Sequence, residues 1–128
     1  MSKASDYLET AILNVLRNTT LTGVATCYVG LFDGDPTDDG SGATEVTTTI
    51  RVAGRVACTF GAPSGGSMSN SADVDFGTAA GSATVAGFGI YDASSGGNLL
   101  VHGTVTSQAV GSGDTLKFGT GNLVVSVA

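Results

Sequence analysis

The sequence has little positive charge. Five Lys and Arg residues stand against eleven Asp and Glu residues, for a net charge of −6, and residues 56–116 contain no Lys or Arg. A nucleic-acid-binding protein needs a cationic surface that displaces the counterions of phosphate groups, so we exclude a nucleic-acid partner. Binding to an anionic membrane surface is disfavoured for the same reason.

Large aromatic side chains and long apolar runs are also scarce. There is no Trp, and aromatic residues make up 6% of the chain, so we expect a core of small apolar groups with a few Phe residues as its bulky members. No apolar run approaches the roughly 20 residues that span a bilayer. Asp6 and Glu9 stand where a signal peptide would be apolar, so we expect synthesis in the cytoplasm.

Glycine, by contrast, is abundant, with 20 residues among 128. Turn signals recur at intervals of about 8–12 residues, which is typical of a β-sandwich or jelly roll. We therefore predict a mainly β, single-domain, β-sandwich or jelly-roll-like fold with one N-terminal α-helix. Residues 1–20 would hold the helix and residues 21–128 the β-sandwich domain. The predicted strands are Thr26–Phe32, Glu45–Ile50, Arg55–Phe60, Ser67–Asn70, Val74–Phe76, Thr84–Tyr91, Leu99–Thr106, Asp114–Phe118 and Asn122–Val127.

The helix is predicted over residues 5–18, with Asp6 as N-cap and Glu9 as its reciprocal partner. Its apolar residues repeat with helical spacing and form one stripe. An isolated helix of this length is marginal in water, so the stripe must pack either on the chain's own sheet or on a neighbouring subunit. Under the second interpretation the assembly interface consists of Leu8, Ile12, Val15 and Leu16.

Residues that could carry catalysis are few. His102, the only His, has no sequence motif that would bring a nucleophile or carboxylate to it, so we predict a strand side chain facing solvent or a neighbour. Gly87-Phe88-Gly89 lies inside a strand, where glycines mark a close backbone approach or a bend more often than a nucleotide site. We therefore expect no enzymatic activity and no cofactor.

Asp33–Asp39 is an acidic turn region with four carboxylates. Ca²⁺ takes about six to eight oxygen ligands, and clustered Asp residues can supply them. The spacing of an EF-hand is absent, however, and Asp, Pro and Gly are also common in turns for backbone reasons. We favour a structural turn, predict no metal site, and keep a weak cation site as the alternative.

The two cysteines, Cys27 and Cys58, each lie in an apolar alternating stretch. We expect both to be small buried core residues. A disulfide between adjacent strands stays open, because the sequence does not place their Cα atoms.

Four segments of the chain resemble a family of small bacteriophage virion proteins, described as tail-fibre or head-decoration proteins. The segments are SKASDYLETAILNVLRNT, TCYVGLFDGDPTDDGSGATEV, VACTFGAPSGGSMSNSADVDF and FGIYDASSGGNLLVHGTV. The resemblance covers nearly the whole chain and differs at residues 47–54. It implies a virion location, other virion proteins as partners and no catalytic residues.

The position on the particle has two interpretations. A compact chain of 128 residues lacks the repetitive or coiled-coil shaft of a typical fibre. We therefore predict a capsid decoration (cement) protein that binds the major capsid protein as a dimer or trimer. A tail or tail-fibre component that contacts the host is the alternative. A carbohydrate-binding β-sandwich is a third, weakened by the lack of Trp.

Overall fold

A five-stranded antiparallel sheet forms the main layer of the computed structural model, which describes residues 2–126. Its strand order is β1-β7-β6-β2-β3. The elements are β1 (Ser2–Ala4), α1 (Asp6–Val15), β2 (Cys27–Phe32), α2 (Thr47–Ile50), β3 (Val56–Cys58), β4 (Ser67–Ser69), β5 (Val74–Thr78), β6 (Ala83–Tyr91), β7 (Leu99–Val110), β8 (Thr115–Phe118) and β9 (Val124–Ser126).

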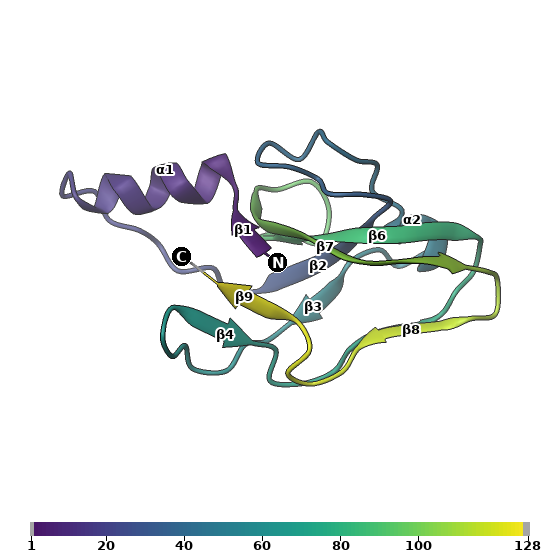
Figure 1. Ribbon diagram of the computed structural model, residues 1–128. Helices are drawn as coiled ribbons and strands as arrows, with labels where there is room; N and C mark the ends of the chain where they lie inside the picture. Colours follow the sequence, from purple (N-terminus) through teal and green to yellow (C-terminus); the bar gives the residue numbers. More distant parts are fainter. Residues whose placement is uncertain (1, 127–128) are drawn as a thin grey trace.

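Two small antiparallel sheets, β4–β9 and β5–β8, form a second layer beneath the main sheet (Figure 1). The core lies between these layers, because side chains of β2, β6 and β7 are buried together with those of β5 and β9. Phe118 of β8 makes edge-to-face contacts with Phe76 of β5 and with Phe88 of β6, and so joins the two layers. The predicted mainly β fold with an N-terminal helix is confirmed.

One predicted strand is wrong. Residues 47–50 of the predicted strand Glu45–Ile50 form α2, a single helical turn. Thr47 and Ile50, three residues apart, are both fully buried, and a helical turn brings side chains at this spacing to one side. The Thr47 hydroxyl accepts a hydrogen bond from the Leu31 backbone N–H at 2.8 Å, so tertiary contacts select the turn.

The outer face of the main sheet is covered by the loop of residues 33–46. Phe32, Tyr91 and Leu99 form a small second cluster there, with Ala43 packed against it. The loop lies so close to β6 that a Cβ added at Gly87 would be 1.9 Å from the backbone oxygen of Gly34. The prediction of a close backbone approach at Gly87 is therefore confirmed.

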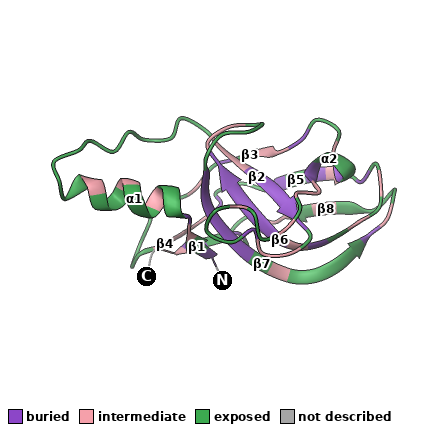
Figure 2. Ribbon diagram, turned by 90° about the horizontal axis from the view of Figure 1, so that it is seen from above, coloured by how far each residue is buried: buried purple, intermediate pink, exposed green. Residues whose placement is uncertain are grey.

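The N-terminal helix is not covered in the same way. Figures 1 and 2 show α1 and the segment after it projecting from the body of the molecule as an arm, which we define as residues 6–26. No residue of α1 is buried. Within residues 2–126, no helix is both long enough and apolar enough to pass through a lipid bilayer.

Candidate assembly surface

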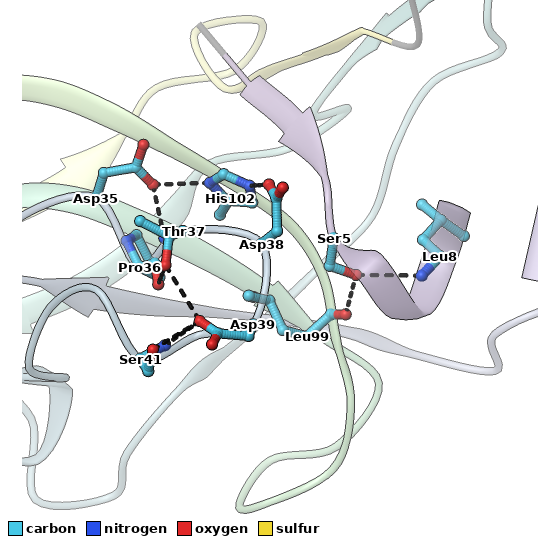
Figure 3. A network of polar contacts seen from close by, with 10 residues as sticks. All are labelled: Ser5, Leu8, Asp35, Pro36, Thr37, Asp38, Asp39, Ser41, Leu99 and His102. Atoms are coloured by element: carbon cyan, nitrogen blue, oxygen red, sulfur yellow. Dashed lines mark hydrogen bonds and ion pairs between the residues drawn. The ribbon is translucent and has the colours of Figure 1, made fainter. Parts of the chain in front are cut away.

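Ser5 fixes the start of the arm to the main sheet. Its backbone N–H donates a hydrogen bond to the Leu100 backbone oxygen at 2.9 Å. Its hydroxyl donates to the Leu99 backbone oxygen (Figure 3). The same hydroxyl accepts a hydrogen bond from the Leu8 N–H at 3.2 Å, which caps α1. Ser5 is thus the N-cap, and the prediction of Asp6 in that role is wrong by one residue.

Apolar side chains are exposed along the whole arm. Of the predicted interface residues, only Leu8 packs partly against the core, while Ile12, Val15 and Leu16 are exposed. Leu16 is 85% exposed. The described residues of the arm include further exposed apolar side chains that the helical stripe did not predict, and these are Tyr7, Leu13, Leu21 and Val24.

Leu13 shows why periodicity missed part of this surface. It lies off the stripe of Leu8, Ile12 and Val15, and it is 62% exposed. A stripe predicts one apolar face against one partner surface. Exposed apolar residues on more than one side of a helix instead mark a surface that needs a partner, because soluble monomers keep such patches small.

A buried histidine holds the loop of residues 33–46 beside the base of the arm. The His102 side chain is only 2% exposed, its Nδ1 lies 2.7 Å from Asp35 Oδ1, and its Nε2 lies 2.7 Å from Asp38 Oδ1 (Figure 3). Each ring nitrogen thus faces one carboxylate oxygen, and the tautomer of the ring decides which nitrogen donates. We call these three residues the His102 clamp. The prediction that His102 faces solvent or a neighbour is wrong.

The clamp also connects to α1. The backbone N–H of Asp6, the first residue of the helix, donates to the backbone oxygen of Asp38 at 3.1 Å. Lys3 of β1 pairs with His102 in the strand register, so the base of the arm and the clamp share one corner of the sheet. The direction in which α1 leaves the body is therefore set by Ser5 and Asp38 together.

The carboxylates of Asp33–Asp39 are used in local hydrogen bonds. Asp39 accepts from the backbone N–H and the hydroxyl of Ser41, and these bonds hold its pKa below the usual range. Burial raises the pKa of Asp35, but hydrogen bonds from the Thr37 N–H and from His102 outweigh it, and the pKa is lowered overall. Within residues 2–126, no three His, Cys, Asp or Glu side chains are grouped to hold a metal ion.

A second polar network lies at the other end of the same loop. Arg55 makes a two-pronged ion pair with Glu45, at 3.0 and 2.8 Å, and donates to the backbone oxygens of Ala93 and Gly96. Its guanidinium carbon lies 3.5 Å from the centre of the Tyr91 ring. Burial raises the pKa of Glu45, but hydrogen bonds from Arg55 and Thr47 lower it overall. Since four of the five N–H donors of Arg55 bond within the fold, we assign this network a structural role.

The two cysteines face each other. Cys27 of β2 and Cys58 of β3 are directly paired in the antiparallel register, and both are free thiols. Cys58 is buried and Cys27 is half-buried. Burial raises the pKa of both thiols, that of Cys58 to about 11, so neither thiol is an activated nucleophile at neutral pH.

Comparison with known proteins gives one finding. The family described as Podophage GP4 fiber I protein gp80 matches residues 3–126, which is nearly the whole chain. No curated protein matches the sequence.

Proposed function

The chain belongs to the Podophage GP4 fiber I protein gp80 family, and from this premise we propose that it is a non-enzymatic component of a bacteriophage fibre. Membership of this family makes the chain a small phage structural protein of the virion. Its task there is to associate with other virion components. The proposed fibre role goes one step further and rests on the description of the family.

The observation that carries an assembly role is the uncovered apolar arm. An amphipathic helix on a soluble monomer normally buries its apolar side against the body. Here α1 buries none of its residues, although its start is fixed by Ser5. A rigidly anchored but uncovered apolar helix suits a protein that completes its folding contacts on a neighbouring subunit.

A place in the fibre is favoured over a place on the capsid. The capsid-decoration prediction rested on the small size of the chain and on the lack of a shaft in its sequence. The description of the matching family names a fibre protein and does not name a head protein. A short chain can still be one module of a fibre whose length comes from other subunits, so size does not decide between the two.

Immunogold electron microscopy of phage that carries an epitope tag at the C-terminus of this chain tests the proposal. We expect gold at fibres; gold spread evenly over the head would overturn the fibre assignment in favour of decoration. The copy number relative to the major capsid protein gives an independent reading. A small fixed number supports fibres, and a number close to that of the capsid protein supports decoration.

The role of the arm is tested with point variants, because deleting residues 1–18 would also remove β1. We expect Leu13→Asp to reduce incorporation into particles. Val52→Asp is the matched control, since Val52 is an 83% exposed apolar residue on the body of the molecule. Equal incorporation of both variants would show that the arm has no part in assembly.

A further inference from the structure

The arm has a short helix that the rest of the chain does not support. An α-helix of ten residues is marginal in water by itself, and most helical stability in proteins comes from packing. Beyond Leu8, which touches the core, no apolar residue of α1 belongs to either hydrophobic cluster of the described residues. A surface of this kind requires a partner, and the structure holds two indications of which partner.

The first indication is the area that the chain exposes. The accessible surface is 6870 Å² for a chain of 12.6 kDa. Compact monomers of this mass expose about 6,200 Å². The difference of roughly 700 Å² is close to the ~800 Å² that each partner buries in an interface of standard size. The excess exposed surface of the chain, to which the projecting arm contributes, is thus large enough for one side of a specific dimer interface.

The second indication is the charge along α1. Asp6 and Glu9 lie in the first turn, and Arg17 lies just beyond the last. If two copies of α1 lie antiparallel, the acidic start of each faces the basic end of the other, and the two helix dipoles also oppose each other favourably. A parallel pair would instead place like charges side by side. The charges of the helix thus complement a second copy in one orientation only.

We infer that the arm is a homodimer interface in which α1 packs antiparallel against α1 of a second copy. This inference rests on the proposed fibre function, because it names the subunit that the arm contacts. The apolar side chains around Ile12, Leu13 and Leu16 of the two copies bury each other. Glu9 of each copy flanks the pair near Arg17 of the other. The two β bodies then lie at opposite ends of the paired arms.

Sedimentation velocity of the purified full chain is the primary test. Over roughly 1 to 100 μM, the range of weak specific association, we expect a concentration-dependent dimer. Leu16→Glu should raise the dissociation constant by at least about a hundredfold, because a charge would enter the apolar surface between the two helices. Val52→Glu, at an exposed apolar residue of the body, should leave the dimer unchanged. A chain that stays monomeric, or a dimer indifferent to Leu16→Glu, overturns the inference.

A charge-swap series tests the orientation. Arg17→Glu and Glu9→Arg should each weaken the antiparallel dimer by about tenfold, since each replaces two flanking ion pairs by two repulsions. The double variant E9R/R17E should recover wild-type affinity. In a parallel pair, the single variants would only exchange one like-charge contact for another. Unchanged affinity in both single variants therefore overturns the antiparallel arrangement. Circular dichroism of each variant checks that the β fold is intact.

The two proposals fail separately. A monomer that is still built into phage fibres would overturn the self-pairing and leave the fibre function standing. A dimer that is absent from phage fibres would overturn the fibre function and leave the self-pairing of the arm standing.

Discussion

Replacing Gly87 by Ala tests how tightly the loop of residues 33–46 is held on the main sheet. The added Cβ would lie 1.9 Å from the backbone oxygen and 2.7 Å from the carbonyl carbon of Gly34. It would also lie 3.1 Å from the Gly103 oxygen on the neighbouring strand. Real Cβ contacts are much longer, so the backbone must move.

The strand cannot be the part that moves. β6 is hydrogen-bonded to β2 on one side and to β7 on the other, so Gly87 is fixed within the sheet. The loop must therefore move away from the sheet. Gly34 precedes Asp35, one of the two carboxylates that contact His102, so this movement also disturbs the His102 clamp. Overpacking alone costs about 1–3 kcal/mol. With partial loss of the His102 clamp, we expect a total near the upper limit, about 3 kcal/mol.

Thermal unfolding measures this directly. With an unfolding entropy of about 2.1 cal/mol/K per residue, 3 kcal/mol corresponds to a fall in Tm of about 11 °C for a chain of this length. Gly23→Ala is the control, because a Cβ at Gly23 meets nothing within 4 Å. Its Tm should stay within about 2 °C of the wild type. A fall at Gly87→Ala no larger than that at Gly23→Ala would refute the close contact between loop and sheet.

Three further predictions concern the polar networks and the cysteines. His102→Ala should lower the free energy of unfolding in urea by about 2 kcal/mol, because two carboxylates lose their shared hydrogen-bond partner and a cavity opens; a loss below about 0.5 kcal/mol would contradict the clamp. Glu45 has a lowered pKa in the fold, so its contribution is present above its ordinary value of 4.5 and is lost as the pH falls through the folded value. Glu45→Gln should therefore be less stable than the wild type at pH 7, and the two should converge in acid; a constant difference would contradict the ion pair with Arg55. Oxidised glutathione should convert Cys27 and Cys58 to one intramolecular disulfide with loss of two hydrogens. The reaction should be slow at pH 7 and faster at alkaline pH, because the pKa values of both thiols are raised. Mass spectrometry that finds only glutathione adducts would show that the pair cannot close.

The elements that the sequence predicted well are those encoded locally. The strands around Thr84–Tyr91 and Leu99–Thr106 pair as the β6–β7 hairpin, because their residues and the Gly96-Gly97 turn favour that structure without outside help. The N-terminal helix was predicted in the same way from the helical spacing of its apolar residues. What failed was α2, where β-branched residues 47–50 suggested a strand. There the buried contacts of Thr47 overrode the local preference.

His102 marks the limit of sequence reasoning at the site. Its partners Asp35 and Asp38 lie 67 and 64 residues away, and no motif connects them. The acidic turn was visible as a group of carboxylates, and the histidine was visible as a single residue. Only the position of the 33–46 loop across β7 shows that they form one network. The lone histidine in an apolar strand and the acidic loop thus belong to one hydrogen-bond network.

The arm differs from both cases, because the sequence predicted an apolar stripe on the helix and left open what the stripe packs against. The helical stripe allowed packing on the sheet or on a neighbour, and in the structure no residue of α1 is buried on the sheet. Ser5 and the Asp6 backbone are tied to β7 and to the loop, so the helix leaves the sheet edge and points away from the core. To fold back, it would have to break these hydrogen bonds. The same contacts that stabilise the base of the arm therefore keep its apolar side chains exposed.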